Sequence, residues 1–143
     1  LSSRLWGKDF QEKQIRCIVP MNGFYEFSGP KGSKSAHYFH PKSTELWGAA
    51  GIYSKVSPNK GMGSFSIITT DPNSMVEKVH DRMPAFLHPS EFDDWLNPEH
   101  SPEYLLDMLK PYPEDDMETY IASSQVSNSR NNGPELLERS TLL

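Results

Sequence analysis

The hydrophobic and polar positions of this chain change their period near residue 16. Between Ser3 and Ile15 apolar side chains recur at helical spacing, which predicts a short amphipathic helix. Beyond it, short runs rich in β-branched and aromatic residues alternate with turns of Gly, Pro, Asn and Ser, which is typical of strands. The runs predicted as strands are 17–20, 23–28, 37–40, 47–53, 65–70 and 118–122. The dense turn residues at 29–34 predict a hairpin between the second and third of these runs, and residues 57–63 are predicted to form a loop.

Short helices are predicted between the later strands. Asp71 and Pro72 resemble an N-cap followed by proline at the first helical position, which predicts a helical turn through Val76. Residues 89–96 and 101–110 read as two further helices, the second opening with a Ser cap and a proline. Residues 83–87 are predicted to be extended, and the tail after residue 122 is predicted to be a loop.

The order of these elements predicts an α+β fold class. Strands and short helices are interleaved without a regular βαβ period, which disfavours a doubly wound parallel sheet. We predict a curled, barrel-like, mainly antiparallel sheet flanked by short helices. At 143 residues the chain is one domain's worth, and we treat residues 1–143 as a single domain.

Composition narrows the class of protein further. Cys17 is the single cysteine, so no intramolecular disulfide can form, and no Cys/His cluster has zinc-ligand spacing. No apolar run approaches the roughly 18 residues of a membrane span, and no signal peptide opens the chain. We expect a cytoplasmic, monomeric protein with neither metal nor cofactor. Because the chain opens at Leu1 and not at Met, we also expect its N-terminal segment to be missing.

Charge is distributed unevenly along the chain. The net charge is −5, yet residues 1–90 carry 11 Lys and Arg against 7 Asp and Glu. Residues 91–118 carry Lys110 alone against 10 acidic residues. A solvated helical face is the simpler explanation of this acidic run. The alternative is a molecule whose acidic side faces away from a basic, DNA-facing groove.

Glu26 is the first candidate for chemistry. A strand places Phe24, Glu26 and Ser28 on one face and Tyr25 and Phe27 on the other. Glu is mostly exposed in proteins, which favours a solvent-facing carboxylate. If the aromatic neighbours desolvate the carboxyl, its pKa rises and it can exchange protons near neutral pH.

His80 and Arg82 are the next candidates. Histidine suits proton transfer near neutrality, although a lone histidine is more often a surface residue or bonded to a backbone carbonyl. Arg82 can bind a phosphate, and an ion pair with Asp81 or another local carboxylate is about as frequent. Four histidines lack distinctive neighbours and stay unassigned: His37, His40, His88 and His100.

No other motif of the chain supports a catalytic nucleophile or a nucleotide-binding site. Cys17 lies between apolar residues of a predicted buried strand, where a cysteine packs as a small hydrophobic residue. The chain has no Gly-x-Ser-x-Gly elbow, phosphate loop or dinucleotide fingerprint. Hydrolase and nucleotide-enzyme templates are therefore disfavoured.

Taken together, five stretches of the chain resemble the SOS-response-associated peptidase (SRAP) family. They occur in the family's order and span nearly the whole chain: Arg16–Phe27, Trp47–Tyr53, Phe65–Thr70, His80–Pro84 and Asn132–Leu137. One such motif would be weak evidence for the family, whereas five motifs in the same order are specific evidence.

The resemblance implies an abasic-site sensor of the SOS response to DNA damage. In this family a cysteine after the initiator Met becomes N-terminal by autoproteolysis, and its amine and thiol trap an abasic site in single-stranded DNA as a thiazolidine. The chemistry needs an acid and an imidazole beside the aldehyde. By position, Glu26 and His80 correspond to these catalytic groups, and Arg82, Thr69 and Thr70 to DNA-binding residues. Peptidase and lyase activities are associated with the same family.

Two family features have no counterpart in the sequence. The N-terminal cysteine and an Asn-x-Arg pattern should precede Leu1, and neither role transfers to Cys17, Ser2 or Arg4. Two alternatives therefore stay open beside the crosslinker. One is a peptidase acting on protein substrates, and the other is a non-catalytic DNA-binding module that has lost the nucleophile.

Overall fold

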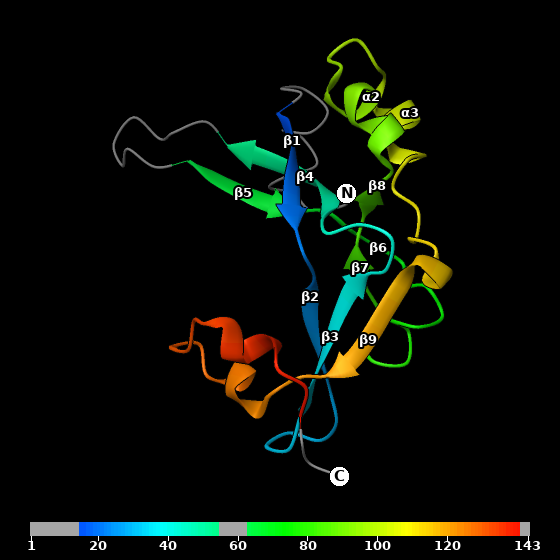
Figure 1. The fold of residues 1–143 in the computed structure, drawn as a ribbon. Coiled ribbons are helices and arrows are strands. Elements are labelled where there is room, and N and C mark those ends of the chain that lie inside the picture. The colour runs from blue at the N-terminus through cyan, green and yellow to red at the C-terminus, as the bar shows by residue number, and fades with distance from the viewer. Residues whose placement is uncertain (1–14, 55–62, 141–143) are drawn as a thin grey trace.

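The computed structural model describes residues 15–54 and 63–140 (Figure 1). The predicted N-terminal helix and most of the predicted loop at 57–63 lie outside these residues. In the described residues the chain forms antiparallel sheets with a few short helical segments, so the predicted α+β class is confirmed.

The first sheet is built around β4 (Trp47–Ser54). Strand β1 (Arg16–Met21) pairs with it antiparallel along its whole length, and β5 (Ser64–Ile67) and β8 (Phe86–Leu87) also pair with β4. Gly51 lies opposite Cys17 and leaves little space, since a Cβ at this position would lie 2.9 Å from the Cys17 Sγ.

The second sheet has the order β2 (Phe24–Ser28), β3 (Ser35–Pro41) and β9 (Met117–Ile121), all antiparallel. A turn at residues 29–34 joins β2 to β3, as predicted, and Gly29 and Gly32 adopt positive φ angles of 104° and 93° there. Glycine tolerates this conformation because it lacks a Cβ. The resulting register pairs Glu26 with His37.

A third, two-stranded sheet joins β6 (Thr69–Thr70) to β7 (Met83–Pro84). Ile68 and Ala85 anchor it beside β4, because Ile68 N–H donates to the Ala50 carbonyl and Ala50 N–H donates to the Ala85 carbonyl, at 2.9 and 2.8 Å. The predicted run 65–70 is thus divided between two sheets. The barrel-like closure we predicted is not found, because the described strands fall into three sheets and none of these closes on itself.

Residues 89–96 are helical throughout, as predicted, whereas the second predicted helix, 101–110, is reduced to residues 102–106. The helical segments of the described residues are η1 (Pro89–Glu91), α2 (Phe92–Leu96), α3 (Pro102–Leu106), η2 (Glu114–Asp116), η3 (Ser124–Ser127) and η4 (Pro134–Leu137). The predicted cap is present at α3, where Tyr104 N–H donates to the Ser101 hydroxyl. The predicted helical turn through Val76 is present, but the start predicted at Asp71 is wrong. Residues 74–79 form hydrogen-bonded turns, and Asn73 accepts the first bond in place of Asp71.

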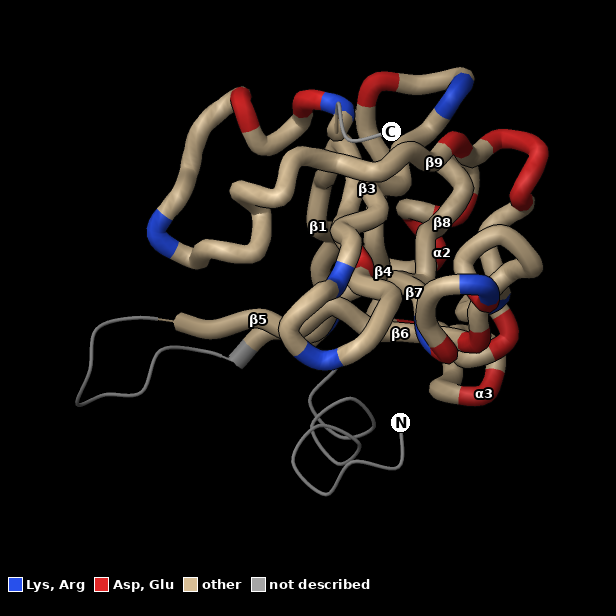
Figure 2. Tube along the Cα trace, turned by 90° about the horizontal axis from the view of Figure 1, so that it is seen from below, with Lys and Arg blue, Asp and Glu red and all other residues tan. Residues whose placement is uncertain are grey.

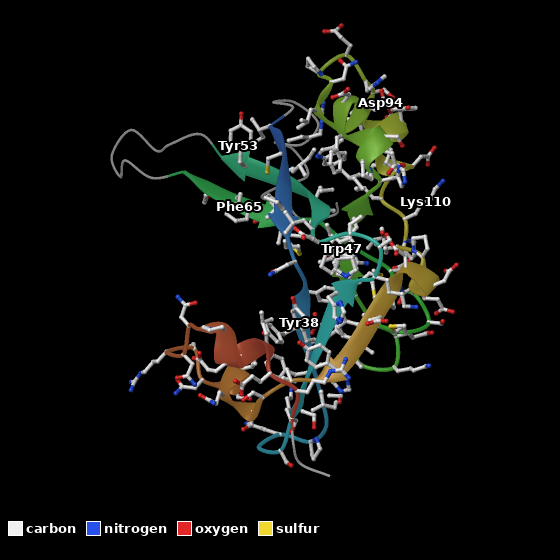
Figure 3. The ribbon with its side chains drawn as sticks, viewed as in Figure 1. Tyr38, Trp47, Tyr53, Phe65, Asp94 and Lys110 are labelled. Carbon is white, nitrogen blue, oxygen red and sulfur yellow. The ribbon has the colours of Figure 1, made fainter. Side chains whose placement is uncertain are left out.

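Two of the three hydrophobic clusters in the described residues join the sheets to the helices and to each other. One packs Trp95 of α2 and Leu105 of α3 against Ala50 and Ile52 of β4. The other lies between the first two sheets, and Figure 3 shows its residue Trp47 at their junction. Its buried members are Phe39, Trp47, Ala49, Val76, Met83, Phe86 and Met117. This second cluster positions the candidate site.

Candidate active site

Glu26 lies in the middle of β2 with its side chain partly withdrawn from water. Phe24 packs into the cluster between the sheets, whereas Tyr25 and Phe27 pack on the opposite face of the strand, as the alternation predicted. The Glu26 side chain is 26% exposed. Burial raises the pKa of the Glu26 carboxyl, and the nearby His80 offsets part of this increase. The desolvated alternative therefore describes Glu26 better than the solvent-facing one.

His80 lies beside Glu26, although the two residues are 54 positions apart in the sequence. The distance from His80 Nδ1 to Glu26 Oε1 is 3.8 Å, and the Asp81 carboxylate lies 3.4 Å from the same nitrogen. The Arg82 N–H and the Arg82 carbonyl both lie 3.1 Å from His80 Nδ1. This nitrogen accepts from the N–H in one tautomer and donates to the carbonyl in the other. The backbone of Arg82 therefore accommodates the imidazole as a proton donor and as a proton acceptor.

One cluster brings these two side chains together. Phe24, two residues before Glu26, stacks on Phe39 at 5.0 Å within the cluster between the sheets. Val76 is fully buried in the same cluster, and its carbonyl accepts the His80 N–H at 2.9 Å. Because both residues are attached to one packed core, the carboxyl and the imidazole lie side by side.

The pair has the chemical properties of an acid and base. A carboxyl with a raised pKa retains its proton at higher pH than an ordinary Glu, so it can donate that proton. Imidazole accepts and donates protons near neutrality. The His80 side chain is 41% exposed, so a substrate can reach the pair. This arrangement can protonate a leaving oxygen and accept a proton from a nucleophile in the same place.

Arg82 is held next to the pair by Thr69. Its guanidinium donates to the Thr69 carbonyl and hydroxyl, and it forms an ion pair with Asp71 at 3.3 Å. The Arg82 side chain is 46% exposed, which leaves part of the guanidinium open to solvent. Thr70 points elsewhere, since its hydroxyl donates to the Leu109 carbonyl at 2.7 Å. The structure thus brings Arg82 and Thr69 together and separates the Thr70 hydroxyl from them.

His37 is a neighbour of the site that was not predicted from the sequence. It lies directly opposite Glu26 in the β2–β3 register, and its Nε2 is 2.7 Å from the Ser28 hydroxyl. Burial lowers the pKa of the His37 imidazole. The signal was present in the sequence, because a hairpin with its turn at residues 29–34 pairs these two positions.

The other histidines and the cysteine lie outside this site. His40 is 3.8 Å from Glu118, His88 caps η1, and His100 contacts Asp94 at 3.0 Å. Cys17 is half-buried in β1, and burial raises the pKa of its thiol. A raised pKa lowers the reactive thiolate fraction, so this environment suits a packing role.

Charge is separated in space as well as in sequence. Figure 2 shows Asp and Glu gathered along α2, α3 and the chain leading to β9.

In residues 15–54 and 63–140, no group of three or more His, Cys, Asp or Glu is placed to hold a metal ion. Within the same residues no helix is both long and apolar enough to cross a bilayer.

Fold and site together define an antiparallel α+β domain with a carboxyl and an imidazole beside an exposed arginine. The chain belongs to the SOS response associated peptidase (SRAP) family, whose family model matches residues 1–129. The abasic site processing protein YoqW of Bacillus subtilis is 43% identical over 86% of this chain and 57% of its own length. The abasic site processing protein HMCES of Rattus norvegicus is 32% identical over 92% of this chain and 45% of its own.

Solved structures show the same fold. A protein from Bacteroides thetaiotaomicron superposes with a TM-score of 0.82 at 30% identity, covering 97% of this chain and 62% of that protein. A phage-related protein from Bordetella bronchiseptica gives a TM-score of 0.63 at 26% identity, covering 81% of this chain and 57% of that one. The chain spans about half the length of the curated relatives it matches.

Proposed function

We propose that this chain carries the acid–base half of an abasic-site processing site that crosslinks to single-stranded DNA. The full-length protein would supply an N-terminal cysteine, exposed by autoproteolytic removal of the initiator Met. The observation that carries the proposal is the 3.8 Å approach of Glu26 Oε1 to His80 Nδ1. The names of the relatives, abasic site processing proteins, support the same substrate.

The proposed reaction has two bond-forming stages. The cysteine amine adds to the C1′ aldehyde of the ring-opened abasic sugar, and loss of one water gives an imine. The thiol then adds across the C=N bond, so that a C–S bond forms, the nitrogen gains a proton and the thiazolidine ring closes. Protonated Glu26 donates to the departing hydroxyl group, and His80 transfers the proton needed to open the sugar.

The neighbouring residues would bind the DNA strand. Arg82, partly exposed next to the pair, is placed to hold a phosphate beside the reacting sugar. Thr69 fixes the direction of its guanidinium through its carbonyl and hydroxyl. Thr70 contributes through its place next to Thr69 in β6, because its own hydroxyl is bonded to Leu109.

The decisive experiment uses the full-length protein and single-stranded DNA with one abasic site. We expect a heat-stable adduct on a denaturing gel with abasic DNA, and none with intact DNA of the same sequence. Unchanged mobility together with cleavage of a peptide substrate would replace the proposal by a peptidase. Binding to DNA with neither reaction would indicate a non-catalytic module.

Arg82→Ala tests the proposed phosphate contact. We expect weaker binding to intact single-stranded DNA, and a slope of log affinity against log salt that is smaller by roughly 0.7, the value for one lost phosphate contact. Fluorescence anisotropy at several salt concentrations measures this slope. Lys42→Ala is the matched control, because Lys42 follows β3 and donates to the Asp115 carbonyl. An unchanged slope for Arg82→Ala would remove Arg82 from the DNA surface.

A further inference from the structure

The segment that carries His80 is tied to a second segment about 40 positions later in the chain. Three side chains make the ties. The Thr70 hydroxyl donates to the Leu109 carbonyl at 2.7 Å, the Asn73 amide donates to the Tyr112 carbonyl at 2.8 Å, and the Ser74 hydroxyl contacts the Glu114 carboxylate. We call residues 109–114 the brace. It lies within the acidic region whose role the sequence left open.

Asn73 is the central tie and also begins the turns that lead to His80. Its Oδ1 accepts the Val76 N–H at 2.9 Å, and its carbonyl accepts the Glu77 N–H at 2.9 Å. Its own N–H points to the Met83 sulfur at 3.3 Å. One side chain therefore fixes where the turns start and, through Nδ2, how far they lie from the brace.

The turns transmit this placement to the imidazole. Val76, whose N–H is held by Asn73, is fully buried, and its carbonyl accepts the N–H groups of Val79 and His80 at 2.8 and 2.9 Å. Two consecutive sets of hydrogen bonds therefore connect Asn73 to His80. The Asn73 side chain holds the Val76 N–H, and the carbonyl of buried Val76 holds the His80 N–H. A shift of Asn73 would move the ring relative to Glu26, which belongs to a different strand.

The brace is itself held to the rest of the fold. The Tyr112 hydroxyl donates to the Asp116 carboxylate at 2.5 Å, and that carboxylate also accepts the Ser43 N–H at 3.1 Å. The Tyr112 ring packs edge-on against Trp47 and Phe86, with centroids 5.5 and 5.7 Å apart. Since Tyr112 is fixed by the core, its carbonyl is a stationary acceptor for Asn73.

We propose that the brace sets the position of the His80 imidazole against Glu26, and that Asn73 is the positioning residue through which it acts. The inference rests on the proposed function for its kinetic consequence, although the placement of the ring can be measured without it. Neither Asn73 nor the brace touches the reacting groups in this scheme. Their effect on the reaction passes through His80.

A double-mutant cycle in the full-length protein tests the proposal. Asn73→Ala should slow adduct formation on abasic single-stranded DNA by about 10-fold, because small misplacements of a catalytic group are costly. In a His80→Ala background the same change should slow the remaining reaction less than 2-fold, because the ring it positions is gone. Equal slowing in both backgrounds would assign Asn73 to general folding and overturn the proposal.

Asn73→Asp separates the brace from the local cap. The carboxylate keeps an acceptor for the Val76 N–H but loses the donor to the Tyr112 carbonyl. If the brace matters, Asn73→Asp is slowed as Asn73→Ala is. A rate equal to that of the wild type would leave only the cap and overturn the role of the brace. Asn131→Ala is the matched control, since Asn131 likewise donates its amide to a backbone carbonyl, that of Gln125, at 3.0 Å.

A readout independent of the reaction keeps the two proposals distinguishable. The NMR chemical shifts of the His80 ring should change in Asn73→Ala, and should stay unchanged in Asn131→Ala. If the wild type forms no adduct, the proposed function fails while this measurement still decides the role of Asn73. Chemical shifts of the His80 ring identical to those of the wild type would overturn the positioning role.

Discussion

Glu26→Gln is expected to slow crosslinking to abasic single-stranded DNA by about 10²- to 10³-fold, the usual contribution of a positioned general acid. The amide keeps the size of the carboxyl and cannot deliver its proton. Binding to intact DNA should stay within about 2-fold, since Glu26 is proposed to act on the aldehyde and not on phosphates. Single-turnover adduct formation, followed on denaturing gels, measures the rate.

The same substitution should not destabilise the protein. The pKa of the Glu26 carboxyl is raised in the folded state, so folding favours its protonated form. That stability is present below the ordinary pKa of Glu and is lost as the pH rises through the raised value. Above the raised pKa the ionised carboxylate is therefore slightly unfavourable, and Glu26→Gln should there unfold at the same temperature as the wild type or 1–2 °C higher, roughly. Near pH 3 the difference should vanish.

A matched pair elsewhere in the fold supplies the control. Glu118 of β9 lies 3.8 Å from His40, the same separation as in the candidate site. Because this second pair lies outside the candidate site, Glu118→Gln should crosslink at the wild-type rate. Wild-type rates in Glu26→Gln, or an equal loss of binding to intact DNA, would reassign Glu26 to the surface of the domain.

Among the substitutions proposed for this protein, Arg16→Met is expected to cause the largest loss of stability, about 2–4 kcal/mol in the free energy of unfolding. Arg16 is 6% exposed, and its guanidinium donates to the carbonyls of Trp95 and Asn97 at 2.6 and 2.7 Å. These carbonyls end α2, so one side chain of β1 holds the end of this helix. Met preserves most of the packing volume and leaves both acceptors without their donor.

Urea unfolding at pH 7 measures the effect of Arg16→Met, which should lower the midpoint without changing the slope. Lys42→Met is the control, because Lys42 is exposed and donates to a single carbonyl. Its effect should stay within about 0.5 kcal/mol. A comparably small loss in Arg16→Met would mean that water replaces the guanidinium at the end of α2.

Local patterns of the sequence were sufficient for most of the strands. The alternation of residues 24–28 predicted which side chains share a face with Glu26, because successive side chains of a strand point to opposite sides. The dense turn residues at 29–34 predicted the β2–β3 hairpin, since Gly29 and Gly32 supply the positive φ angles it needs. The Ser101 cap was predicted because its hydrogen bond is local.

Wherever a distant contact competes with a local preference, the sequence was less informative. Asp71–Pro72 has the pattern of a helix start, yet Asn73 takes that role, because its amide also bonds to the Tyr112 carbonyl. Residues 65–70 form an uninterrupted β-type run, yet Ile68 bonds to β4 between two strands of different sheets. Neither partner can be identified from its neighbours in the chain.

The sequence by itself determined the fold class, the faces of β2 and the residue types of the candidate acid–base site. Only the tertiary structure decided that Glu26 and His80 lie 3.8 Å apart, that Thr70 points to Leu109 instead of Arg82, and that the acidic segment braces the His80 turn. The reason is physical. Periodicity and turn chemistry act over a few residues, whereas these distances arise from side chains of separate segments packing into one core.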